Sequence, residues 1–216
     1  MNKLFILLLS LYVNITFTQD YQLADQYRDE IKQLAGNPVI QASFDYIRSL
    51  EDQTQSDHVA LTEIEAPPFK EEKRAKIFRD MLAAIGADTI WIDEVGNVLA
   101  LIKGTEGNRT VCLDAHLDTV FPEGTDVHVK IKNDTLYAPG IGDDTRGLAM
   151  LLTIIKTLHA QKIKMQDDVL IIASVGEEGL GDLRELSDQH GRGILPDGDG
   201  DEDADQGRTT RRCEVV

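Results

Sequence analysis

The apolar segment DVLIIASV at 168–175 limits the choice of fold more than any other part of this chain. An unbroken series of Val, Leu and Ile residues is typical of a parallel strand that is covered on both faces. A second apolar strand, TVCLDAHL at 110–117, precedes it, and an amphipathic helix is predicted between them, from about 144 to 160. A strand, a crossover helix and a second strand form a parallel unit, so we predict an α/β fold.

Shorter signals place further elements around this unit. The segment TIWIDEVGNVLALIKG at 89–104 predicts two short strands that meet at Gly96-Asn97, a strong signal for a tight turn. The segment KEEKRAKIFRDMLAAIGA at 70–87 has apolar residues on one helical face and a glycine near its end, so it predicts a helix. Residues 20 to about 55 predict two helices, and helical character continues until Pro67-Pro68.

Composition and charge narrow the class of protein. A chain of 216 residues that is 42% hydrophobic and 28% charged suits a globular domain. The net charge of -16 argues against a nucleic-acid partner, because phosphate backbones are bound by clustered Lys and Arg. Residues 1–18 combine a lysine, a short apolar stretch and small polar residues, which predicts a cleaved signal peptide and a secreted or periplasmic protein. The stretch is too short for a stable membrane span.

The cysteine content predicts no disulfide scaffold. Cys112 and Cys213 are the two cysteines of the chain, too few for a disulfide framework. Cys112 lies inside an apolar strand, so we predict that it is a small core residue.

Polar side chains gather where the central strands end and where the crossover helix begins. They are His116 with Asp118, Asp143 with Asp144, and Glu177 with Glu178. Because ligands bind beyond the carboxyl ends of the strands in such sheets, we expect the three pairs at one edge. An imidazole with several carboxylates suits divalent zinc. One glutamate can then bind metal while its neighbour takes a proton from water, and Asp118 can orient the His116 ring.

Each pair taken alone has a simpler interpretation. A His-x-Asp sequence in a strand is more often a satisfied polar pair than a metal site. An aspartate such as Asp144 ahead of a helix is ordinarily an N-cap, and a Glu-Glu pair in a Gly-rich turn is usually solvated. The joint occurrence of the three pairs, in order and at one edge, favours the metal site.

Three segments, LDAHLDTVF, GIGDDTRGLAMLL and GEEGLGDLR, resemble the successive motifs of a known family. It is the dizinc exopeptidase and deacylase family that includes peptidase T, glutamate carboxypeptidase, aminoacylase and acetylornithine deacetylase. The resemblance covers about 59–184 and implies a three-layer catalytic domain with a mixed, largely parallel sheet. It also implies cleavage of amide bonds in peptides or N-acyl amino acids with two Zn²⁺ ions, for which Co²⁺ or Mn²⁺ are alternatives.

The resemblance also implies a role for each site residue. His116 would bind the first zinc, Asp143 would bridge both ions, and Glu178 would bind the second zinc. Asp118 would be the catalytic aspartate behind His116. Glu177 would be the general base.

The resemblance ends after Arg184. Family members continue with a further acidic zinc ligand, a lid domain that dimerises and a last histidine ligand, whereas 185–216 is rich in charge and glycine and predicts a disordered acidic tail. We therefore expect a partial catalytic domain at 19–184, without the lid and dimerisation domain, from a truncated or frame-shifted version of the family. His190, in the tail, is the nearest candidate for a replacement ligand.

Three functions stay open on these observations. The first is a metal-dependent amide hydrolase. The second is a catalytically inactive remnant that binds metal weakly or not at all. The third is an acidic calcium-binding or interaction protein, suggested by DGDGDEDADQG at 197–207, although Glu202 and Arg208 occupy positions where a calcium loop needs Gly and Glu.

Overall fold

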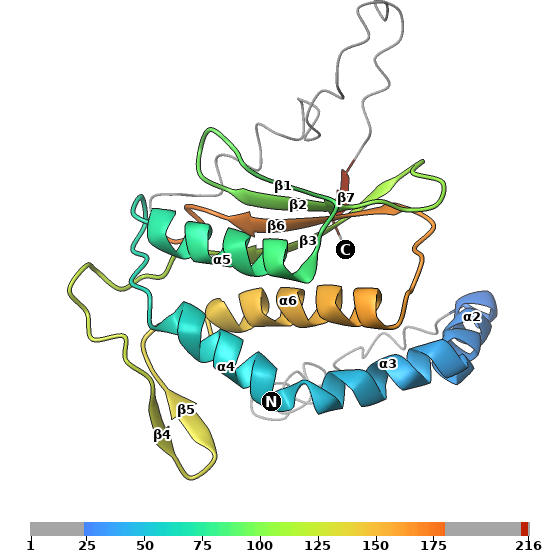
Figure 1. The fold of residues 1–216 in the computed structure, drawn as a ribbon, viewed down its shortest axis with the longest axis horizontal. Helices are drawn as coiled ribbons and strands as arrows, with labels where there is room; N and C mark the ends of the chain where they lie inside the picture. The colour runs from blue at the N-terminus through green and yellow to red at the C-terminus, as the bar shows by residue number, and fades with distance from the viewer. Residues whose placement is uncertain (1–23, 180–212, 216) are drawn as a thin grey trace, which may run out of the picture. The chain divides into compact units, whose positions relative to one another are not determined.

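The computed structural model describes residues 24–179 and 213–215, coloured by position along the chain in Figure 1. The predicted signal peptide at 1–18 lies outside the described residues, so cleavage and export stay predictions. Most of the predicted acidic tail lies outside them too, including His190. The chain divides into two units, residues 1–41 and the remainder. The candidate site lies in the second unit.

Helix α2 (Asp25–Gly36) belongs to the first unit, and α3 (Pro38–Ser49) begins in it. The second helix opens as a capped helix should, because Asn37 Oδ1 accepts a hydrogen bond from Val39 N at 2.8 Å. These two helices confirm the prediction for the segment that follows residue 20. No helix among residues 24–179 is long and apolar enough to cross a bilayer.

A five-stranded mixed sheet forms the centre of the second unit (Figure 1). In spatial order its strands are β1 (Thr89–Ile92), β2 (Val98–Ile102), β6 (Asp168–Ser174), β3 (Thr110–His116) and β7 (Cys213–Val215). Two neighbouring pairs, β1 with β2 and β2 with β6, are antiparallel. The other two pairs, β3 with β6 and β3 with β7, are parallel. The α/β class and the mixed sheet are therefore confirmed.

The predicted parallel unit is present and positions the site. Strands β3 and β6 run in register from Thr110 opposite Asp168 to His116 opposite Ser174. Every residue of β6 is buried, as its unbroken apolar sequence predicts. Helix α6 (Thr145–Ala160) connects the two strands. Because the strands are parallel, both carboxyl ends lie at the same edge of the sheet.

The main core lies between one face of the sheet and helices α5 (Glu72–Ile85) and α6, which lie side by side in Figure 1. Helix α4 (Glu51–Thr62) packs on α6. The large, fully buried apolar residues that the three helices contribute are Leu61, Phe78, Leu82, Leu148, Leu152 and Ile155. Burying such a side chain contributes about 1.5–3 kcal/mol each, so this face anchors the sheet.

The opposite face of the sheet carries a smaller apolar cluster. It consists of Leu99, Leu101, Cys112, Leu170 and Ile172, with Trp91 of β1 packed against it. Cys112 is buried, as predicted, and it is also disulfide-bonded, which the sequence analysis did not predict. Spacing in the sequence does not reveal whether two cysteines meet in space.

Helix α4 ends earlier than the sequence predicts, at Thr62 rather than at the two prolines. The next residues make tertiary hydrogen bonds in place of helical ones. Ala66 O accepts from Thr119 N at 2.9 Å, and Ile64 O accepts from the guanidinium of Arg74. These bonds join the segment between α4 and the two prolines to α5 and to the residues after β3.

The hairpin of β4 (Lys130–Lys132) and β5 (Thr135–Tyr137) was not predicted. Its turn residues Asn133 and Asp134 both have positive φ, 48° and 56°. Two such residues are the signature of a tight hairpin turn, so a local signal was present in the sequence.

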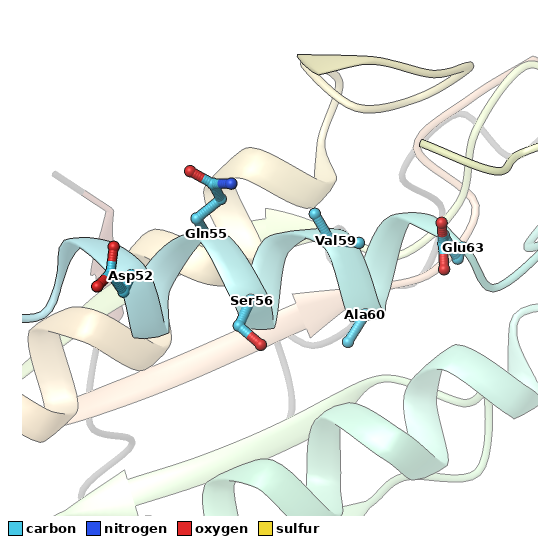
Figure 2. A pocket seen from close by; sticks show the side chains of 6 residues that line it. All are labelled: Asp52, Gln55, Ser56, Val59, Ala60 and Glu63. Atoms are coloured by element: carbon cyan, nitrogen blue, oxygen red, sulfur yellow. The ribbon is translucent and has the colours of Figure 1, made fainter. Parts of the chain in front are cut away.

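A shallow hollow of about 510 Å³ lies along α4 (Figure 2). The residues that line it are Asp52, Gln55, Ser56, Val59, Ala60 and Glu63. Their spacing of three or four residues places them on one face of the helix. None of them is a candidate metal ligand, so the hollow is separate from the site described next.

Candidate metal centre

The candidate site lies at the carboxyl ends of β3 and β6. His116 is the last residue of β3, opposite Ser174, the last residue of β6. The Glu177-Glu178 pair begins three residues after the end of β6. Asp143, two residues before α6, reaches the same edge, where its Oδ1 lies 2.9 Å from His116 Nε2. The structure thus brings the three predicted polar pairs together.

The two ring nitrogens of His116 face different groups. Nε2 faces the exposed carboxylates, 2.9 Å from Asp143 Oδ1 and 3.8 Å from Glu177 Oε2. Nδ1 faces Asp118, 3.0 Å from its carbonyl oxygen and 3.6 Å from its Oδ1. The ring itself is buried. One nitrogen can therefore bind an ion while the other is held from behind.

Asp118 connects the end of β3 to the loop that carries the two glutamates. Its side chain is fully buried. Asp118 Oδ1 accepts from Glu177 N at 3.1 Å, and Oδ2 accepts from Glu178 N at 2.8 Å. A carboxylate that accepts two backbone N–H bonds is held in one orientation, so Asp118 needs no ion to keep its position.

The charges of the site shift its pKa values in opposite directions. Burial lowers the pKa of His116, but hydrogen bonds to Asp118 and Asp143 and the charges of Asp118 and Asp144 outweigh it and raise the pKa to about 9. Burial raises the pKa of Asp118, but hydrogen bonds from His116, Glu178 N and Glu177 N outweigh it and lower the pKa below its usual value. The carboxylates around His116 therefore favour a positive charge at this edge of the sheet.

Asp143 and Asp144 are adjacent but serve different purposes. Asp144 is the N-cap of α6, as predicted, with its Oδ1 accepting from Gly147 N at 3.0 Å. A Cβ at Gly147 would lie 2.4 Å from that oxygen, so only glycine fits beneath the cap. The side chain of Asp143 is 81% exposed and extends toward His116. The peptide bond that joins the two aspartates is cis.

Helix α4 holds the loop that precedes Asp143. Thr62 Oγ1 and Thr145 Oγ1 are 2.8 Å apart, and Thr145 also donates to Gly140 O at 3.0 Å. His58 Nε2 lies 2.6 Å from Ile141 O. Burial lowers the pKa of His58, which favours a neutral ring that donates this bond. The sequence reasoning did not find these residues, although a histidine and a threonine four residues apart share one helix face.

Arg74 of α5 supports the segment after β3 and was also not predicted. Its side chain is only 1% exposed. Nη1 donates to Leu117 O at 2.5 Å, and Nη2 donates to Ile64 O. Burial lowers the pKa of Arg74 to about 10, and the charge of Asp118 opposes that shift. The sequence did contain a signal for a buried arginine, because Arg74 lies next to Ala75 and Phe78, which belong to the apolar face of the helix.

The donor set fits a divalent cation. His116, Glu177 and Glu178 each offer one ligand atom, and these atoms lie within 4.8 Å of one another. Asp143 adds a fourth donor next to His116 Nε2. Nitrogen and carboxylate ligands of this kind suit zinc and related metals. Both glutamates could therefore reach one ion that is bound to His116.

Comparisons with known proteins find similar sequences over part of the chain. Residues 112–205 match the family model of peptidase family M20/M25/M40. Carboxypeptidase G2 from Pseudomonas sp. (strain RS-16) is 30% identical over 84 residues, which cover 38% of this chain and 20% of that protein. The chain spans between about a fifth and about a third of the length of the curated relatives it matches.

Solved structures share the fold. A tripeptidase from Staphylococcus aureus subsp. aureus Mu50 is 25% identical, with a TM-score of 0.53 over 64% of this chain and 40% of that one. Human carnosine dipeptidase 1 is 18% identical, with a TM-score of 0.60 over 72% of this chain and 39% of that one. In residues 112–205 and in fold, the chain is therefore similar to members of peptidase family M20/M25/M40.

Proposed function

We propose that this protein is a metal-dependent amide hydrolase that acts on peptides or N-acyl amino acids next to a free terminus. The observation that carries the proposal is the convergence of His116 Nε2, Asp143, Glu177 and Glu178 at one edge of the sheet, with the buried Asp118 behind the imidazole. The relation to a family of peptidases supports it.

The residues that would hold zinc are His116, Asp143 and Glu178. Asp143 would be a ligand that two ions share, as the family motifs imply, and its exposed side chain already reaches the imidazole from a separate loop. When bound, zinc supplies Lewis acidity, which polarises a substrate carbonyl and lowers the pKa of water.

The protein's own residues would perform the proton transfers. Glu177 is 41% exposed and faces His116 Nε2, so its carboxylate can take a proton from the attacking water and deliver it to the leaving amine. Asp118 would orient the His116 ring through Nδ1 and hold Glu177 and Glu178 through their backbone N–H groups.

A second candidate is metal binding without turnover, and one observation favours it. Within residues 24–179, three of the five ligands that the family motifs imply are present. Each of two ions would share Asp143 and have one further ligand, His116 or Glu178, whereas catalytic zinc sites normally use three protein ligands. Weak binding is the expected consequence.

Turnover separates the two candidates. A panel of dipeptides and N-acyl amino acids is incubated with the full chain and added Zn²⁺, alongside the variants E177Q and E30Q. Glu30 is an exposed residue of α2 and serves as the matched control. Loss of a general base should lower turnover by about 10²–10⁴-fold in E177Q and leave E30Q unchanged.

The possible results are distinct. Zinc retained in dialysed protein without turnover supports the second candidate. Preference for Ca²⁺ over Zn²⁺ contradicts both and supports the acidic calcium-binding alternative, whose segment at 197–207 lies outside the described residues. Turnover that is equal in E177Q and wild type removes Glu177 from its proposed role.

A further inference from the structure

The turn between β1 and β2 contains a buried amide that reaches the candidate site. Asn97 is 1% exposed. Its Oδ1 accepts from Val175 N at 2.8 Å, and its Nδ2 donates to Asp93 Oδ2 at 2.9 Å. Asp93 Oδ1 in turn accepts from the backbone N–H groups of Val95, Gly96 and Asn97, at 3.1, 2.9 and 2.9 Å. Asn97 is thus fixed from one side and fixes a second chain segment from the other.

The segment that Asn97 holds carries the two glutamates. Val175 is the first residue after β6, and Gly176 follows with a φ of 69° before Glu177 and Glu178. Asp118 accepts from the backbone N–H of both glutamates. The segment 175–178 is therefore held at its start by Asn97 and at its end by Asp118.

We propose that Asn97 is a positioning residue for Glu177 and Glu178, acting through the backbone of Val175. The proposal rests on the proposed function, since it takes these glutamates as the proton acceptor and a metal ligand. It explains why the turn needs an amide: the position requires an acceptor toward Val175 N and a donor toward the Asp93 carboxylate. Asparagine supplies both groups, whereas an ionised aspartate supplies acceptors alone.

The first variant is N97D, which keeps the shape of the side chain and removes the donor. Two carboxylates, at positions 93 and 97, then face each other in a buried place. Their repulsion displaces the side chain at 97, which weakens its bond to Val175 N. We expect backbone hydrogen exchange over 175–178 in metal-free protein to become about tenfold faster, and Co²⁺ affinity to fall about tenfold with an altered visible absorption band. N108D, the same change at an exposed asparagine, should alter none of these.

The second variant exchanges the pair, as D93N/N97D. Asn at 93 can donate to Asp at 97 and still accept from the turn N–H groups, while Asp at 97 still accepts from Val175 N. The exchange rate and the Co²⁺ band should return to within about threefold of wild type, because every hydrogen bond of the network has a partner again. This double variant decides the question even if N97D alone fails to fold.

The outcomes separate this proposal from the proposed function. Restored exchange and a restored Co²⁺ band in the double variant support the positioning role, whether or not the protein turns over substrate. Unchanged exchange over 175–178 in N97D, or a double variant that stays as impaired as N97D, overturns it. The exchange measurement uses metal-free protein, so it still tests Asn97 if the hydrolase proposal fails.

Discussion

The two halves of the candidate site are held in different ways. His116 and Asp118 lie at the end of β3, buried and bonded to backbone groups on two sides. Asp143 and Glu177 lie across from them with side chains 81% and 41% exposed. In the buried half the protein alone fixes each side chain. In the exposed half, carboxylates of like charge share a small space and have few fixed contacts.

This difference indicates what each half contributes. Buried, hydrogen-bonded groups are preorganised, so the β3 half should add to the stability of the fold whether or not metal is bound. Exposed carboxylates repel one another, so the other half should gain most from a cation. The comparison can be tested by changes that separate stability from metal binding.

The largest effect on stability is expected from D118N. The amide would direct N–H groups at Glu177 N or Glu178 N, so at least one of these two backbone donors loses its acceptor. We expect the free energy of unfolding of the metal-free protein to fall by about 3 kcal/mol, measured by urea denaturation. D45N, the same change at an exposed aspartate of α3, is the control. A loss below about 1 kcal/mol would show that Asp118 does not hold the glutamate loop.

Added zinc should have a slightly smaller effect, in the opposite direction. A ligand that binds only the folded state at a hundred times its dissociation constant stabilises that state by about 2.7 kcal/mol. Urea denaturation with Zn²⁺ and with a chelator measures the shift. E178Q should reduce it, because the variant loses a ligand from the exposed half. An equal shift in E178Q and wild type would mean that zinc binds elsewhere.

The sequence predicts the residues of the site whose positions follow from a single helix or strand. A period of two places His116 and Asp118 on one strand end, the apolar run at 168–175 predicts the parallel partner, and Asp144 precedes its helix as a cap should. Each of these signals lies within one element or at its boundary, where periodicity and capping operate.

The supporting residues could not be predicted in the same way. Arg74, His58 and Asn97 each bond to a backbone group that is far away in the sequence. Their partners are carbonyl or N–H groups, which every residue carries, so no residue type marks the partner. The carbonyls of Ile64 and Ala66, after α4, likewise accept from groups that are distant in the sequence.

A smaller loss is expected when α4 loses the Thr62 hydroxyl, which contacts Thr145 at the start of α6. T62V keeps the side-chain shape but removes the bond to Thr145 Oγ1, so the free energy of unfolding should fall by about 1 kcal/mol. Hydrogen exchange should quicken over 140–145 and stay unchanged over 175–178. T105V, at an exposed threonine, is the control. Faster exchange over both segments would mean that the two loops are held as one unit.

The smallest effect on stability is expected from D143N, the exposed counterpart of D118N. Because the Asp143 side chain is 81% exposed, its replacement should change the free energy of unfolding by no more than about 0.5 kcal/mol. The same variant should lower Zn²⁺ affinity by at least about tenfold, measured by competition with a chelating dye, since it removes a charged donor next to His116 Nε2.

An unchanged free energy of unfolding together with a lower Zn²⁺ affinity in D143N would separate a residue that binds metal from one that supports the fold. Asp143 and Asp118 both contact the same imidazole, yet the first does so from solvent and the second from the interior. If D143N instead destabilises the metal-free protein as much as D118N, then the bond from His116 to Asp143 is part of the folded core. The exposed half would then be preorganised as well, and the cation would add to an arrangement that the protein already maintains.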